Sequence, residues 1–265
     1  MENTVRFLGT GAADQPWKEI HQDSRVRGST SSLINGKILV DCGPTTWQDL
    51  EHWNVDLSQV ETLIFTHGHS DHCNRENVVR LITAVPKLQI YSSEALAASL
   101  KASGISAERI HTVVPKQKFT AAGLEVLTLA ANHASVLPPE CPEGEVPMHY
   151  LFRDGASGRT LFYALDGAWL LRPTFLALLD YHLDTIIWDC TMGGTGDFRI
   201  FEHNSLEMLD LMLQTLGRLK ITNADTNVWL DHLAWTLWPQ ERDEAAALAG
   251  SHRYRLAQDG NTISW

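Results

Sequence analysis

The sequence lacks several features that would place it in other classes of protein. No apolar run approaches the roughly 18 residues that cross a bilayer, so we expect no membrane-spanning helix. No basic segment followed by a long apolar one stands near residue 1, so we expect no secretory signal. The four cysteines form no C-x-x-C pair, which favours a reducing, cytoplasmic environment over a disulfide framework. Lys/Arg-rich runs are missing and the net charge is -11, so a large nucleic acid is not expected as partner.

The rest of the composition is typical of a globular protein, with 44% hydrophobic and 20% charged residues. We expect one domain spanning residues 1–265, because a chain of this length can bury one large core. Strand-like runs recur along the chain, and several are bounded by Gly, Asn or Asp. They begin at residues 4, 31, 62, 88, 124, 149, 159, 185, 227 and 253.

Hairpins and helices give the coarse architecture. Asn35-Gly36 and residues 155–158 are predicted to be hairpin turns. Helical spacing of apolar residues predicts three helices, in segments 93–104, 204–219 and 239–250. For the second of these, Asn204 and Glu207 have the spacing of a capping box. Early hairpins followed by alternating strands and helices predict a mixed α/β fold with helices covering the sheets.

The segment IFTHGHSDHC, residues 64 to 73, places three histidines and an aspartate directly after an apolar run. Side chains at i and i+2 of an extended segment point the same way, so His67 and His69 can bind one ion together. Asp71 and His72 lie where the chain is expected to bend, and they can face a second position. Imidazole and carboxylate suit zinc, manganese or iron. The alternative is a polar surface loop, which this density of ligand-type residues disfavours.

The segment THGHSDH resembles the H-x-H-x-D-H signature of the metallo-β-lactamase superfamily. Four further landmarks of that superfamily occur in the expected chain order at strand-like ends, namely Asp41, His133, Asp166 and His232. The resemblance implies an αβ/βα four-layer sandwich, in which two mixed sheets lie face to face, helices cover the outside and metals bind at one edge.

The same resemblance implies two divalent metal ions, zinc or manganese, with iron as a further option. The first ion would be bound by His67, His69 and His133. The second would be bound by Asp71, His72 and His232. Asp166 would bridge both ions, and Asp41 would accept a hydrogen bond from a metal-binding histidine. Such ions lie about 3.5–4 Å apart and can share a hydroxide that attacks the substrate at neutral pH.

Residues 6–13, 25–36 and 201–208 look like the phosphodiesterase branch of the superfamily. That branch includes a cyclic phosphodiesterase of phosphonate breakdown and the tRNA 3′-processing endonuclease. His203 in EHNSL matches the histidine that acts as an acid near the leaving group of the phosphonate enzyme. The catalytic candidates are His203 and, from the H-x-H-x-D-H segment, Asp71. The alternative for His203 is a role in capping the next helix. Ser205 replaces the aspartate of that segment, and the cysteine-rich zinc site and the long basic arm of these relatives have no counterpart.

The expected function is a phosphodiesterase acting on a small anionic diester, cyclic diesters included, through a metal-bridging hydroxide. The alternatives are a thioesterase or lactonase of the same superfamily, a nuclease, or a non-catalytic binding protein. Arg25, Arg27 and the glycine-rich residues 192–197 have either a substrate-binding or a structural role, and no substrate-binding residue is assigned. Residues 134–147 are predicted to form a loop near the mouth of the site. The sequence leaves open whether the protein is a homodimer. The glutamates of that loop are expected to face solvent or a second subunit: Glu140, Glu143 and Glu145.

Overall fold

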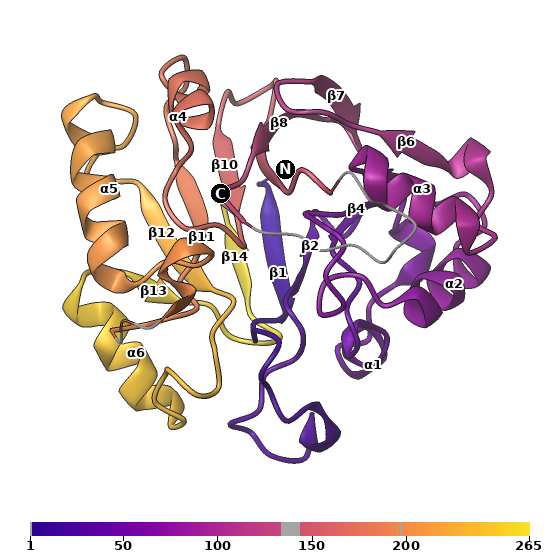
Figure 1. The fold of residues 1–265 in the computed structure, drawn as a ribbon, viewed down its shortest axis with the longest axis horizontal. Helices are drawn as coiled ribbons and strands as arrows, with labels where there is room; N and C mark the ends of the chain where they lie inside the picture. The colour runs from indigo at the N-terminus through magenta and orange to yellow at the C-terminus, as the bar shows by residue number, and fades with distance from the viewer. Residues whose placement is uncertain (1, 134–143, 195, 197) are drawn as a thin grey trace.

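The computed structural model describes residues 2–133, 144–194, 196 and 198–265, and its strands form two seven-stranded sheets (Figure 1). From edge to edge, the first sheet contains β14 (Thr262–Ser264), β1 (Thr4–Gly9), β2 (Ser31–Ile34), β3 (Ile38–Val40), β4 (Thr62–Ile64), β5 (Gln89–Ser92) and β6 (Ile110–Thr112). The second contains β13 (Arg255–Leu256), β12 (Asn227–Asp231), β11 (Thr185–Asp189), β10 (Thr160–Ala164), β9 (Met148–Arg153), β8 (Leu124–Ala130) and β7 (Lys118–Ala121).

Helices cover the outer face of each sheet. Beside the first sheet lie α1 (Thr46–His52), α2 (Arg75–Ala84) and α3 (Glu94–Ala102). Beside the second lie α4 (Arg172–Leu178), α5 (Leu206–Arg218) and α6 (Arg242–Ser251). Figure 1 shows the two groups on opposite sides of the strands. Four short 3-10 helices complete the described elements: η1 (Trp17–Glu19), η2 (Leu57–Gln59), η3 (Ala107–Arg109) and η4 (Phe198–Phe201).

Alternation along buried strands produces this layering, since successive side chains of a strand point to opposite faces. In β3, Leu39 packs into the cluster beneath α1–α3, whereas Ile38 and Val40 pack between the sheets. In β11, Trp188 packs toward α4–α6 and Ile187 packs between the sheets. Both faces of each central strand are therefore apolar, and the predicted four-layer sandwich is confirmed.

Strand direction brings one set of strand ends together. β3, β4 and β5 are parallel, as are β10, β11, β12 and β13. β8 and β10 are both antiparallel to β9, so β8 runs in the same direction as β10. The segments that follow β3, β4, β8, β10, β11 and β12 consequently leave the sheets at corresponding ends. In open α/β sheets such carboxyl ends form the usual binding crevice.

The hairpin predictions agree with the structure. Asn35 and Gly36 both have positive φ, 53° and 69°, in the turn between antiparallel β2 and β3. Residues 155–158 connect antiparallel β9 and β10.

The predicted capping box at Asn204 is wrong. Ser205 caps α5 by accepting a hydrogen bond from the Met208 N–H at 3.4 Å. Asn204 instead donates to the Gly167 carbonyl and accepts from the Trp169 N–H.

No helix within the described residues is long and apolar enough to cross a membrane.

Candidate metal centre

The seven residues expected to bind metal meet at the shared end of the strands. These seven residues form two groups of potential ligands that have Asp166 in common, and in each group the candidate donor atoms lie within 4.8 Å of one another. His232 directly follows β12 and Asp166 lies two residues after β10, and both are in the left-handed region, with φ of 60° and 50°. Asp41, at the end of β3, has φ of 63°. Such backbone strain in non-glycine residues tends to occur at functional sites.

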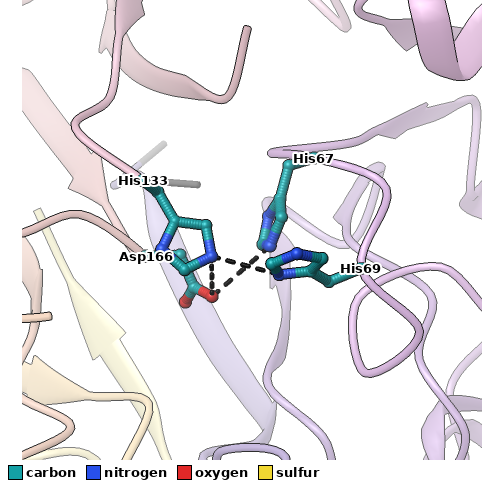
Figure 2. Close-up of side chains that lie close together, drawn as sticks. All are labelled: His67, His69, His133 and Asp166. Atoms are coloured by element: carbon teal, nitrogen blue, oxygen red, sulfur yellow. Dashed lines mark hydrogen bonds and ion pairs between the residues drawn. The ribbon is translucent and has the colours of Figure 1, made fainter. Parts of the chain in front are cut away.

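The first group contains His67, His69, His133 and Asp166, whose side chains point toward one another in Figure 2. Nδ1 of His69 lies 3.1 Å from Nε2 of His133. Oδ2 of Asp166 lies 3.5 Å from Nε2 of His67 and 3.7 Å from Nε2 of His133. A tetrahedral zinc site with bonds of about 2.0–2.1 Å separates neighbouring ligand atoms by about 3.3 Å. These spacings therefore suit a single small cation.

The second group contains Asp71, His72, His232 and the same Asp166. Nε2 of His72 lies 3.2 Å from Nε2 of His232 and 3.4 Å from Oδ2 of Asp71. Oδ2 of Asp166 lies 3.2 Å from Nε2 of His72, and Oδ1 lies 3.2 Å from Nε2 of His232. Oδ2 of Asp166 thus lies near histidines of both groups, and Oδ1 lies near the second group, so this carboxylate is placed to contribute to both positions.

Two Asp–Thr pairs orient the histidines. The Thr66 hydroxyl donates to Asp41 at 2.7 Å, so its oxygen can accept from Nδ1 of His67 at 3.0 Å. Asp41 also accepts from Nδ1 of His72 at 2.8 Å. These bonds leave Nε2 of both rings directed into the site. The hydrogen bond expected between Asp41 and a ligand-type histidine is therefore present.

The second sheet repeats this arrangement. The Thr191 hydroxyl donates to Asp189 at 2.8 Å and can accept from Nδ1 of His232 at 2.8 Å. Asp189 also lies 2.8 Å from Nδ1 of His203. Asp189 and both threonines were not predicted from the sequence. The signal for Asp189 was present, because an Asp-Cys pair ends an apolar strand there as it does at Asp41.

His203 lies against both ligand groups, with its ring centroid 5.0 Å from that of His133 and 5.3 Å from that of His232. Asp189 engages Nδ1, so Nε2 is the nitrogen that can act on another molecule. Burial disfavours the charged ring, but the Asp189 carboxylate outweighs it and raises the pKa of His203 to about 9. The ring is consequently a proton donor at neutral pH.

The protonation states of Asp71, Asp166 and His67 suit metal binding. Burial opposes ionisation of Asp71 and Asp166, but the surrounding imidazoles outweigh it and hold the pKa of both carboxyls well below the usual range. Burial lowers the pKa of His67 well below its ordinary value. Neutral imidazole and ionised carboxylate are the forms that bind metal. Burial disfavours the charged ring of His72, but the carboxylates of Asp166, Asp71 and Asp41 outweigh it and raise the pKa of His72, so this ring must release a proton when an ion binds. Nε2 of His67 is buried and has no hydrogen-bond partner in the described part of the chain, as expected of a ligand atom.

The expectation that Glu145 faces solvent is wrong. Its Oε2 accepts a hydrogen bond from the Gly68 N–H at 2.7 Å, between His67 and His69, and its Oε1 accepts one from the Ser93 hydroxyl. Both bonds involve the charged carboxylate, which makes them stronger than hydrogen bonds between neutral groups. The other two glutamates of the predicted loop, Glu140 and Glu143, belong to residues 134–143, which lie outside the described residues.

The two arginines left open by the sequence have structural partners. Arg25 pairs with Asp23 at 2.6 Å on the surface. Arg27 is buried and donates to the Thr10 hydroxyl and to the Ala257 carbonyl. In the glycine-rich segment 192–197, residues 195 and 197 lie outside the described residues. The Gly193 carbonyl of this segment accepts a hydrogen bond from the Leu206 N–H at the start of α5.

A family model described as the beta-lactamase superfamily domain matches residues 37–192, more than half of the chain. The chain belongs to the beta-lactamase superfamily. The matched residues include Asp41, the H-x-H-x-D-H segment, His133 and Asp166, whereas His203 and His232 lie beyond them. The family and the sandwich together confirm the resemblance seen in the sequence, and members of this fold bind divalent metals.

Individual relatives give further comparisons. The chain is 28% identical over 138 residues to ribonuclease Z of Methanopyrus kandleri. That match covers 50% of this chain and 47% of the relative, so the chain spans about half of the relative's length. The metallo-beta-lactamase fold protein YhfI from Bacillus subtilis covers 100% of both chains with a TM-score of 0.73 and 16% identity. A diphosphatase of the PhnP family covers 100% of this chain and 98% of its own, with a TM-score of 0.71 and 17% identity.

Proposed function

We propose that this protein is a dinuclear metal-dependent phosphodiesterase that acts on a small anionic diester. The observation that carries the proposal is the pair of ligand groups that share Asp166, with His203 placed against both. The donor set fits zinc or manganese, with iron as a further option, because it combines imidazoles with carboxylates. His67, His69 and His133 would hold the first ion, and Asp71, His72 and His232 the second.

Bound ions would supply Lewis-acid activation of the phosphoryl group and a nucleophile at neutral pH. The residues of the chain do the rest. Asp166 would contribute to both positions, since its Oδ2 lies near His67 of the first group and His72 of the second. Asp71 would contribute Oδ2 to the second position and accept a hydrogen bond from the attacking water. Asp41 and Thr66, with Asp189 and Thr191, would hold the imidazoles against rotation and so preserve the geometry between turnovers.

His203 would protonate the leaving oxygen from Nε2. Cleavage of a diester generates an alkoxide, and a positioned imidazolium can donate a proton to it. Asp189 supports this role because it holds Nδ1 and favours the charged ring. The negative charge of the protein, -11, makes a large polyanion a poor substrate, so we propose a small diester rather than RNA.

The comparisons are consistent with chemistry at phosphorus. A ribonuclease and a diphosphatase both break bonds to phosphorus, and each resembles this chain over the residues or the fold described above.

The test uses purified protein loaded separately with zinc and with manganese. Bis(p-nitrophenyl) phosphate is compared with a thioester and a lactone at matched concentrations. We expect turnover of the diester to exceed that of the other two. Turnover of the thioester or lactone alone would instead assign the site to the alternative hydrolase classes.

A further inference from the structure

We infer that Phe198 and Phe201 of η4 bind a flat aromatic group of the substrate, so that the preferred diester carries a nucleobase or a similar ring. This inference rests on the proposed phosphodiesterase function. Both rings are 81% exposed, more than any other large hydrophobic side chain of the described residues. Single exposed apolar residues need no explanation, but two phenylalanines on one short turn beside a candidate active site do.

The turn that carries the two rings is bonded to the site. The Glu202 carbonyl, one residue after η4, lies 3.1 Å from Nδ1 of His133. The Arg199 carbonyl accepts from the backbone N–H groups of Glu202 and His203, both at 2.8 Å. Phe201 is therefore two residues from the proposed acid, on a turn whose backbone also positions a proposed metal ligand.

The geometry of a 3-10 helix places both rings on one side. This helix has about three residues per turn, so side chains at i and i+3 eclipse one another. Phe198 and Phe201 have that spacing, and their separation along the helix axis is about 6 Å at roughly 2 Å per residue. The Arg199 guanidinium lies 5.7 Å from the centre of the Phe198 ring, which supports this ring by a cation–π contact.

The chemistry of the turn selects the kind of group it binds. Phenylalanine has no hydrogen-bonding atom in its side chain, so a sugar hydroxyl finds no partner there. A single methyl group buries little apolar surface against it. A nucleobase gains from stacking, since every base has a π-face, and loss of one such stack typically weakens binding roughly 5- to 150-fold. A second copy of this chain is the other occupant that an exposed apolar surface could bind.

The test measures binding rather than turnover, so that it can fail independently of the proposed function. Thymidine monophosphate and methyl phosphate carry the same phosphate charge, but only the first carries a base and the sugar that joins it to the phosphate. Their dissociation constants are measured by calorimetry with zinc-loaded protein, for the wild type and for the F198A/F201A double variant. Leu211→Ala serves as a matched control, because Leu211 is 58% exposed on α5 and is not bonded to the site.

We expect the wild type to bind thymidine monophosphate at least about 5-fold more tightly than methyl phosphate, and the double variant to lose most of that preference. Leu211→Ala should keep it, and the F198Y/F201Y variant should restore it. An equal preference in the wild type and the double variant would overturn the inference. So would conversion of a dimer to a monomer by F198A/F201A in sedimentation, because the rings would then bind a second copy. Failure to hydrolyse any diester, with the base preference intact, would instead refute only the proposed reaction.

Discussion

Replacing His203 by alanine tests the proposed acid. The seven proposed ligands are other residues, so the His203→Ala protein should fold and bind metal as the wild type does. The loss should fall on proton donation to the leaving group, which is worth typically 10²–10⁴-fold. Because water can enter the space left by the buried imidazole and serve as a weaker acid, we expect a loss of roughly 10²–10³-fold in kcat.

The leaving group makes this loss diagnostic. An alkyl leaving group needs a proton as the bond to phosphorus breaks, whereas p-nitrophenolate is stable as an anion. The assay compares kcat of the wild type and of His203→Ala on a dialkyl-type diester and on bis(p-nitrophenyl) phosphate. We expect the large loss only with the first substrate. Asp189→Asn should show the same dependence on leaving group, because it removes the charge that keeps His203 protonated.

A control separates catalysis from helix capping. Ser205, rather than His203, caps α5. Ser205→Ala should therefore cost about 1 kcal/mol of stability and leave the dependence on leaving group intact. Wild-type rates of His203→Ala on both diesters would refute the reasoning, and so would equal losses on both.

Two further predictions concern residues outside the ligand set. Glu145→Gln weakens the hydrogen bonds to Gly68 and Ser93, so we expect roughly 10-fold weaker zinc binding in a chelator competition; an unchanged affinity would contradict this positioning role. Burial raises the pKa of Asp49 from 3.8 to about 6, so the folded state binds more protons and stability falls as pH rises through that range. Between about pH 5 and pH 8 this effect lowers the free energy of unfolding by about 1.4 kcal/mol. Asp49→Asn should remove this pH dependence, as measured by urea unfolding; the same pH dependence in both proteins would show the assignment to be wrong.

Much of the fold followed from the sequence because most of its strands are apolar and bounded by clear turns. β1 and the Asn35-Gly36 hairpin agree with the prediction to the residue or nearly so. The helices α1, α2 and α4 and the strands β6, β7 and β14 were not predicted. Most of these elements have seven or fewer residues, and tertiary packing rather than local periodicity determines such short segments.

The candidate ligands were predictable because strand ends and residue type reveal them. Of the groups that orient them, Asp41 was predicted, but Thr66, Thr191 and the Glu202 carbonyl were not, since a threonine or a backbone carbonyl carries no signal of its own. Glu145 shows the limit most clearly. A Pro- and Glu-rich sequence indicates an exposed loop, and only the fold brings that carboxylate to the Gly68 N–H.

The metal content of the wild type and of Asp166→Ala tests the central claim most directly. Both proteins are saturated with zinc, freed of excess by gel filtration and analysed by mass spectrometry for metal per chain. We predict two ions in the wild type and at most one in Asp166→Ala, because both proposed positions lose the carboxylate that lies near their histidines. One ion in the saturated wild type, or two retained by Asp166→Ala, would contradict a bridged dinuclear site.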